Sequence, residues 1–335
     1  IMSDQGCLQV VCQIYFSFGW KAFTALFDSF GEQHSDYWDS MLAEKGVEDP
    51  LAGLSSRVVE VTTTSALEAI VEILIATNLR GVGIFSYADL PRMVLCSLHT
   101  AVSGGEGFIF GVFGWLRADW PILELDDHDC TAAQMSSAFN YGLRSGATTL
   151  NSLSTRLPCS TTGTATVGDF YTELLLRSEV AGFEYRQEAF PSADSVCMVV
   201  MAYNAMRELG YQPEDFDVFN TSTFTDLMAI FQNTSFAGVS GQIAYPKNGT
   251  AWGASDRIGT YDVRQYVNGA ESVIGYFDQV TESLVIEDGA SFSFPNGFTM
   301  ENPPLATFPA CASGLVYDYP SSSCVGCSDT MVYIS

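Results

Sequence analysis

The sequence is poor in positive charge. Only 14 of its 335 residues are lysine or arginine, against 39 aspartates and glutamates, and the formal charge is −25. A chain this acidic lacks the broad basic face that nucleic acids and anionic membrane surfaces require, so both are excluded as partners. Hydrophobic residues make up 47% of the chain and aromatic residues 13%, which excludes a disordered polymer.

Motifs of the common enzyme classes are also missing. The sequence has no glycine-rich phosphate loop and no nucleophile elbow, and its three histidines share no metal-ligand spacing. Those histidines are His34, His99 and His128. The acidic run at 126–129 lacks the spacing of a calcium loop and fits a solvated loop better. Neither Cys159 nor Cys197 lies in a nucleophile motif, and no acid–base pair suggests a secreted hydrolase. We therefore expect no enzyme, no cofactor and no metal site.

No segment reaches the ~18 uncharged apolar residues that span a bilayer. Three glycosylation sequons and a cysteine-containing tail instead favour a secreted or extracellular setting. The sequons begin at Asn220, Asn233 and Asn248, and the tail cysteines are Cys311, Cys324 and Cys327. The sequence starts at Ile1 without a signal peptide, so we expect it to be a piece of a longer protein.

Short apolar strands alternate with helical stretches in the first third of the chain. The predicted strands are 20–27, 57–63, 81–85 and 108–113, and the predicted helices are 35–45, 65–78 and 88–102. Four strands separated by helices are typical of βαβ units, so this part predicts a parallel sheet with helices on both faces.

The pattern changes after residue 130. Helices are predicted at 130–139, 167–177, 194–209 and 223–232, an extended segment at 142–150, and strands at 242–245, 259–266 and 272–277. Asn248-Gly249 and Asn268-Gly269 are turn signals between the late strands. A βα region, a helix-rich middle and a closing run of strands together predict two interleaved α/β lobes.

In open parallel sheets, ligands bind outside the carboxyl ends of the strands. The residues at these ends are Asp28–Ser29, Thr62–Thr64, Ser86–Tyr87 and Gly114–Trp115. Tyr87 and Trp115 offer aromatic faces to an ammonium group, and Glu188 offers a carboxylate just ahead of a helix. Each residue also has a structural explanation: the aromatic side chains could fill core or hinge, and Glu188 could be a surface residue favoured by the helix dipole.

Five sequence blocks, in the same order, resemble the extracellular ligand-binding region of class C G-protein-coupled receptors, with the GABA type B receptor as the best match. They are Gly83–Cys96 (GIFSYADLPRMVLC), Gly107–Trp120 (GFIFGVFGWLRADW), Glu188–Val196 (EAFPSADSV), Asn233–Ile243 (NTSFAGVSGQI) and Val273–Asp278 (VIGYFD). The opening Ser3-Asp4-Gln5 and Phe18-Gly-Trp20 are similar to the family's entry into its second lobe. The resemblance covers residues 3 to about 287.

The resemblance implies a bilobed Venus-flytrap, an α/β fold of the type I periplasmic-binding-protein class. Residues 1–140 would be the main part of lobe 2, 141–257 the C-terminal half of lobe 1, and 258–290 strands that return to lobe 2. Residues 291–335 would be a linker and the start of a cysteine-rich stalk. The first half of lobe 1 would be absent, and with it the serine hydroxyls that grip a ligand carboxylate, so tight binding is not expected from the chain as given.

The resemblance also assigns ligand contacts. Tyr87 matches a lobe-2 tyrosine that lines the cleft, Trp115 the tryptophan of a Gly-Trp turn, and Glu188 the glutamate that receives the amino group of γ-aminobutyrate. A carboxylate and two aromatic faces suit an ω-amino acid, and contacts from both lobes would couple binding to lobe closure.

Six cysteines precede the tail. Cys96 and Cys130 match a disulfide of the family, although sequence proximity also allows Cys130 to pair with Cys159. Cys7, Cys12 and Cys197 lie in apolar sequence and are expected to be buried thiols.

The expected protein is the ectodomain of a plasma-membrane receptor. By the resemblance its partners would be a small amino-acid-like ligand, a second receptor chain in a homo- or heterodimer through lobe 1, and a G protein that couples to a membrane domain outside this chain. Leu116, where the animal receptor has tyrosine, and the cysteine tail depart from the family. A receptor guanylate cyclase and a secreted, non-signalling binding or scaffold protein are the alternatives.

Overall fold

The computed structural model of the chain divides into two compact units. Unit 1 comprises residues 1–6, 147–262 and 276–283, and unit 2 comprises 7–146, 263–275 and 284–335. The structure describes residues 4–28, 35–47, 49, 64–86, 90–101, 107–113, 130–147, 150–160, 163–181, 189–216, 221–245, 259–279, 281–295, 298–307, 315–318 and 323–326.

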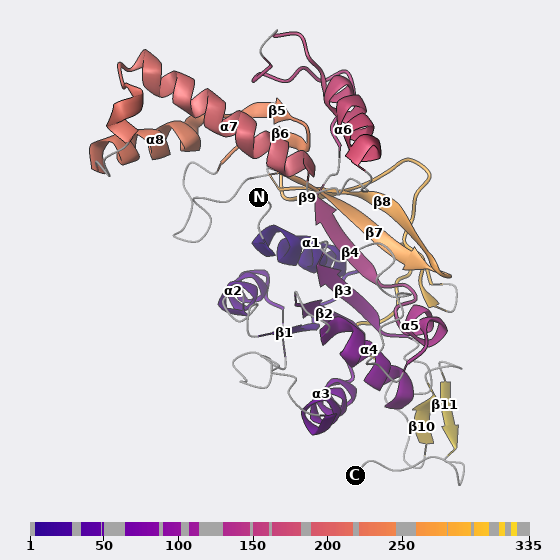
Figure 1. Cartoon of the computed structure of the whole chain (residues 1–335). Helices are drawn as coiled ribbons and strands as arrows, with labels where there is room; N and C mark the ends of the chain where they lie inside the picture. The colour runs from indigo at the N-terminus through magenta and orange to yellow at the C-terminus, as the bar shows by residue number, and fades with distance from the viewer. Residues whose placement is uncertain are drawn as a thin grey trace. The chain divides into compact units, whose positions relative to one another are not determined.

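The central feature is a sheet of seven strands in the order β1-β2-β3-β4-β7-β8-β9 (Figure 1). The strands are β1 (Thr24–Phe27), β2 (Gly81–Phe85), β3 (Ile109–Phe113), β4 (Leu143–Ala147), β7 (Thr260–Val267), β8 (Ala270–Asp278) and β9 (Ser283–Ile286). Strands β1 to β4 pair in parallel, which confirms the predicted α/β class. The strand predicted at 57–63 lies outside the described residues.

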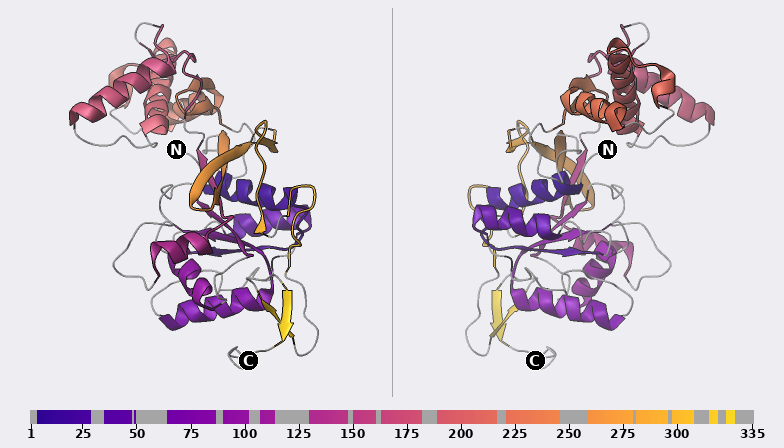
Figure 2. Two further views of the ribbon diagram at one scale, coloured as in Figure 1. Left: turned by 90° about the vertical axis from the view of Figure 1, so that its right-hand side faces the viewer. Right: turned by 90° about the vertical axis from the view of Figure 1, so that its left-hand side faces the viewer.

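Helices cover both faces of the parallel part of this sheet, as the views in Figures 1 and 2 show. The helices are α1 (Asp4–Ser17), α2 (Ser35–Lys45), α3 (Thr64–Thr77), α4 (Leu90–Ala101) and α5 (Ala132–Ala138). Phe110 and Val112 of β3 belong to a buried cluster with α3, α4 and α5. Gly111 lies between them in sequence and faces α1, because successive residues of a strand point to opposite faces.

Helix α1 was not predicted. It is buried almost all round, with Leu8, Val11 and Tyr15 fully shielded from solvent, so its sequence shows no apolar stripe of helical period. The Tyr15 hydroxyl donates to the Ile109 carbonyl of β3 at 2.8 Å. The amide of Trp20 donates to the Tyr15 carbonyl at 3.2 Å, so Trp20 closes the end of α1 and β1 begins only at Thr24.

The N-terminal cysteines are buried thiols, as predicted: Cys7 and Cys12 are both shielded from solvent, and neither forms a disulfide. Burial raises the pKa of the Cys12 thiol, and the nearby Asp49 raises it further. Burial likewise raises the pKa of the Tyr15 phenol. Both groups are therefore neutral at physiological pH, and Cys12 is no candidate nucleophile.

The late strands meet through a tight turn at Asn268-Gly269. Both residues have positive φ, 51° and 85°, which asparagine and glycine tolerate better than other residues. The turn joins β7 to β8, so this turn signal is confirmed; the one at Asn248-Gly249 lies outside the described residues.

The described residues of unit 1 form three α-helices, one 3₁₀ helix and a short antiparallel hairpin. The elements are α6 (Val167–Ala181), α7 (Ala189–Glu208), the 3₁₀ helix η4 (Pro213–Phe216), α8 (Thr221–Asn233), β5 (Phe236–Gly238) and β6 (Gly241–Ile243). Helices α7 and α8 lie side by side (Figure 1). Helix α7 begins at Ala189, one and a half turns earlier than predicted, because Phe190 packs its ring against Tyr171 of α6 at 6.2 Å.

The prediction of a thiol at Cys197 is wrong. Cys197 and Cys159 form a disulfide in unit 1, with their Cα atoms 5.2 Å apart. The bond attaches the loop before α6 to α7, and Cys159 packs against the same apolar cluster as Cys197. Neither sulfur is then available as a nucleophile. A second hairpin, β10 (Leu315–Asp318) and β11 (Ser323–Gly326), belongs to unit 2 and was not predicted.

We predict that Gly111→Ala lowers the free energy of unfolding by about 1–3 kcal/mol, the usual effect of overpacking a core. The added Cβ would overlap the Cγ1 atom of Val11, where α1 crosses β3. Chemical unfolding of the purified variants measures this. The loss should shrink in a Val11→Ala background, which removes the overlapping methyl group.

Gly146→Ala on β4 is the matched control, since an added Cβ there meets no described atom within 4 Å. Equal unfolding free energies for Gly111→Ala and the unchanged chain would contradict the packing of α1 on β3.

Candidate ligand-binding site

The carboxyl ends of β1, β2 and β3 lie at one edge of the sheet. Phe27, the last residue of β1, pairs with Phe85, the last of β2, and Ile84 of β2 pairs with Val112 of β3. The next residues, Asp28 and Ser86, are 7% and 1% exposed. The Ser86 hydroxyl donates to Asp28 Oδ2 at 2.6 Å, so a buried hydrogen bond joins the two strand ends where the sequence predicts a binding edge.

The three predicted ligand contacts, Tyr87, Trp115 and Glu188, lie outside the described residues. Tyr87 comes directly after Ser86, and Glu188 directly before Ala189, the first residue of α7. The structure therefore describes the framework beside two of these positions, and the ligand contacts themselves stay predictions.

The framework beside Glu188 depends on Asp194 of α7. This carboxylate is 3% exposed and accepts three hydrogen bonds. Its Oδ1 atom accepts from the Val239 amide at 2.6 Å, and its Oδ2 atom accepts from the Ser240 amide at 2.8 Å and the Ser240 hydroxyl at 2.5 Å. A buried carboxylate is stable only when its oxygens are hydrogen-bonded in this way.

Asp194 connects two of the sequence blocks that carry the family resemblance, Glu188–Val196 and Asn233–Ile243. Its carboxylate fits because Gly238 has no side chain: a Cβ there would overlap Asp194 Oδ1. The Asn151 side chain reaches the same turn and donates to the Gly238 carbonyl at 3.0 Å. The glycine, the aspartate and the serine of these blocks thus hold the β5–β6 hairpin on α7.

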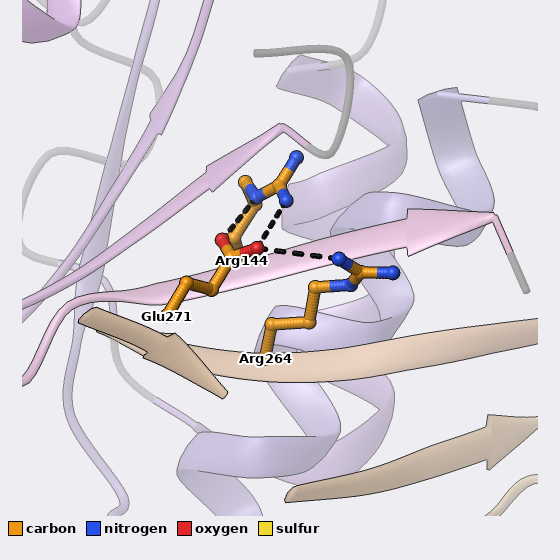
Figure 3. Close-up of polar contacts among 3 residues, drawn as sticks. All are labelled: Arg144, Arg264 and Glu271. Carbon is orange, nitrogen blue, oxygen red and sulfur yellow. Dashed lines mark hydrogen bonds and ion pairs between the residues drawn. The ribbon is translucent and has the colours of Figure 1, made fainter. Parts of the chain in front are cut away.

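A second charged cluster lies within unit 2. Glu271 of β8 is 11% exposed and accepts from Arg144 of β4 through both carboxylate oxygens, with Nε to Oε1 at 2.5 Å and Nη2 to Oε2. Arg264 of β7 donates to the same Oε2 atom at 3.2 Å. Figure 3 shows Glu271 reaching both arginines. The cluster joins three strands and, like Asp194, explains the fold better than it explains a ligand.

The remaining predicted sites divide between the two units. Cys96 and Cys130, the pair implied by the resemblance, form a disulfide with their Cα atoms 5.7 Å apart, which attaches α4 to the start of the α5 segment in unit 2. Asn233 is exposed at the last residue of α8 in unit 1. Asn220 and Asn248 lie outside the described residues, as does the acidic run at 126–129.

Two features are absent from the part of the chain that the structure describes. No group of three or more His, Cys, Asp or Glu side chains there is arranged to hold a metal ion. Among the helices described, none combines the length and the apolar character that crossing a membrane takes.

Sequence reasoning missed the partners of Asp194 and of Glu271. The sequence contains one indication of the Glu271 cluster. Arg144 is a single arginine among the apolar and small residues of β4, and a buried arginine implies an acidic partner. For Asp194, the partners are two backbone amides and the Ser240 hydroxyl of a turn that lies 45 residues further along the chain, and no local pattern links the two segments.

The chain is similar to known receptors over part of its length. It is 26% identical over 207 residues to gamma-aminobutyric acid type B receptor subunit 1 of Caenorhabditis elegans, covering 61% of this chain and 22% of that protein. It is 27% identical over 210 residues to the subunit 1 proteins of Mus musculus and Rattus norvegicus, with 61% of this chain and 21% of each relative covered. No protein-family model matches the chain.

These similarities confirm the resemblance and support an extracellular region of a class C G-protein-coupled receptor. The relatives are receptors by name, not enzymes. The matched part spans about a fifth of the length of each relative.

We predict that Asp194→Asn lowers the free energy of unfolding by about 2–4 kcal/mol, because the amide group would turn a donor toward the donors of Val239 or Ser240. Chemical unfolding measures the loss, and hydrogen exchange should show faster exchange at the amides of Val239 and Ser240. Glu173→Gln, an exposed change on α6 that also removes one negative charge, should stay within about 0.5 kcal/mol of the unchanged chain. Equal effects of the two variants would refute the role of Asp194.

Proposed function

We propose that the chain is the ligand-binding part of the extracellular region of a GABA type B-like receptor and that it is not an enzyme. The observation that carries the proposal is the similarity to subunit 1 of that receptor in a worm and two mammals. The hydrogen bonds of Asp194 support it, since they give two of the resembling blocks a common structural role. The relatives' name points to γ-aminobutyrate or a similar small amino acid as the ligand.

The proposed ligand contacts follow from the chemistry of an ω-amino acid. The Glu188 carboxylate accepts a charge-assisted hydrogen bond from the ammonium group, and Tyr87 and Trp115 enclose the alkyl stem and the positive charge. By the family resemblance, Glu188 would belong to lobe 1 and Tyr87 and Trp115 to lobe 2. A ligand that contacts both lobes would favour their closed arrangement, which is the proposed signal.

The proposed partners follow from the receptor assignment. The intact receptor would act as a homo- or heterodimer at the extracellular side of the plasma membrane and would couple to a G protein through a membrane domain. The net charge of −25 suits an extracellular surface that meets small cationic groups and no nucleic acid.

We predict that γ-aminobutyrate binds to the protein expressed from its complete gene, and that Glu188→Gln weakens binding about tenfold to a hundredfold. The loss corresponds to one charge-assisted hydrogen bond of roughly 1.5–3 kcal/mol. Tyr87→Ala should weaken binding as well. Isothermal titration calorimetry with γ-aminobutyrate, glutamate and glycine measures the affinities.

The control for the ligand experiment is Glu173→Gln, which removes an exposed carboxylate from α6 and should leave the affinity unchanged. Absence of heat with all three amino acids would reject the ligand assignment and favour a non-signalling binding or scaffold protein. Unchanged affinity in both Glu188→Gln and Tyr87→Ala would place the ligand elsewhere.

We predict that Asn233 carries an N-linked glycan when the protein is made in a secretory pathway. Asn233 is exposed, and its Nδ2 donates to the Ala229 carbonyl at 2.8 Å. This bond uses one amide hydrogen, and one hydrogen remains on Nδ2 after a glycan is attached, so the helix end is compatible with the modification. Peptide mass spectrometry before and after glycosidase treatment locates the glycan.

Asn233→Gln should abolish the modification at this site, whereas Asn302→Gln, an exposed asparagine followed by two prolines, should leave the glycan pattern unchanged. An unmodified Asn233 in secreted protein would contradict the prediction.

A further inference from the structure

The segment that follows β9 packs against unit 2 at two places. At the first, Phe292 and Phe294 are 3% and 4% exposed and set their rings edge-on against Phe18, with centroids 5.2 Å and 4.9 Å away. Phe18 lies just after α1. Because Phe18 also packs edge-on against Trp20, the segment adds two rings to an aromatic cluster of unit 2.

Between the two phenylalanines, Ser293 is held by a buried glutamine. The Ser293 amide donates to Gln265 Oε1 at 2.8 Å, and Gln265 Nε2 donates to the Ser293 carbonyl at 2.9 Å. Gln265 of β7 is 1% exposed, so its side chain binds the backbone of Ser293 as a neighbouring strand would. Both backbone groups of Ser293 are satisfied by this single side chain.

At the second place, the segment reaches the beginning of β2. Trp20, 3% exposed, donates its Nε1 hydrogen to the Pro304 carbonyl at 2.7 Å. The Arg80 amide donates to the Ala306 carbonyl at 2.8 Å, and Leu79 forms an antiparallel bridge with Thr307. The backbone here is therefore attached to the sheet-forming part of unit 2 immediately before the strand begins.

We infer that residues 292–295 and 298–307 form a fixed strap on unit 2, not a flexible linker. The strap carries the chain from β9 to a point on unit 2 from which residues 308–314 lead to the β10–β11 hairpin. The β10–β11 hairpin, which belongs to the same unit, would then follow any movement of unit 2. A role of this coupled movement in signalling rests on the proposed function, whereas the anchoring of the strap does not.

Hydrogen–deuterium exchange of the full chain, without any amino-acid ligand, tests the anchoring. The strap amides and the Arg80 amide should exchange slowly in the unchanged chain. Trp20→Phe keeps an aromatic ring but removes the donor to Pro304, and should speed exchange at Arg80 and at residues 298–307 about fivefold, the equivalent of one hydrogen bond. Gln265→Leu should speed exchange around Ser293 without a matching change at 298–307, which tests the first contact independently.

Trp38→Phe is the matched control. Trp38 is also fully buried in unit 2 and donates Nε1 to Asp49 at 2.9 Å, away from the strap in sequence. Its substitution should leave exchange at 298–307 unchanged. Exchange of the strap in the unchanged chain at the rate of an unstructured peptide would overturn the inference, and so would equal acceleration by Trp20→Phe and Trp38→Phe. Because no ligand is present, a failure of the ligand assignment does not affect this test.

Discussion

The parallel pairing of β1 to β4 is the constraint on which the structure of unit 2 depends. Strands such as β2, with all five residues buried, have no face for solvent, so both faces need a helical cover. Helices α3, α4 and α5 supply one cover and α1 and α2 the other. The same pairing brings the carboxyl ends of neighbouring strands to one edge, where a buried hydrogen bond from Ser86 to Asp28 joins β2 to β1. The helices on both faces and the predicted binding edge are thus two consequences of the parallel pairing of the strands.

A second constraint comes from the scarcity of positive charge. With only 14 lysines and arginines in the chain, three arginines, Arg80, Arg92 and Arg144, are nonetheless buried. Two acidic side chains inside the protein meet contrasting partners: Glu271 is matched by guanidinium groups, whereas Asp194 is matched by backbone amides and a hydroxyl. A carboxylate that uses backbone donors needs no cation, which suits a protein this acidic. Each of these two carboxylates also needs its own set of donors, because a buried charge without partners is strongly destabilising.

The sequence predicted those parts of the fold that leave a periodic or local signal. The bounds of α2 and β2 agree with the prediction to the residue, and the Asn268-Gly269 turn follows from residue types that tolerate positive φ. Helix α1 escaped prediction because it is apolar on nearly every side. The bond between Cys159 and Cys197 escaped because pairing depends on tertiary distance. Of the site, the sequence indicated the edge at Asp28 and Ser86 and suggested Tyr87, Trp115 and Glu188 by their chemistry. Their specific ligand roles came from the family resemblance and remain predictions.

Two of the candidate ligand contacts, Tyr87 and Glu188, lie next to the packed framework in the sequence, so the fold and the ligand depend on different residues. Tyr87 follows a buried hydrogen-bonded serine, and Glu188 precedes a helix that Asp194 fixes to a hairpin. The packing of this framework therefore restricts which residue types it accepts. At Gly238, for example, an added Cβ would overlap the Asp194 carboxylate. Residues that contact a ligand can differ between proteins that bind different ligands, while the framework that positions them stays the same. Shared blocks around Asp194 therefore argue for a receptor fold, whereas the proposed amino-acid ligand rests on the family resemblance and on the chemistry of Glu188 and the aromatic pair.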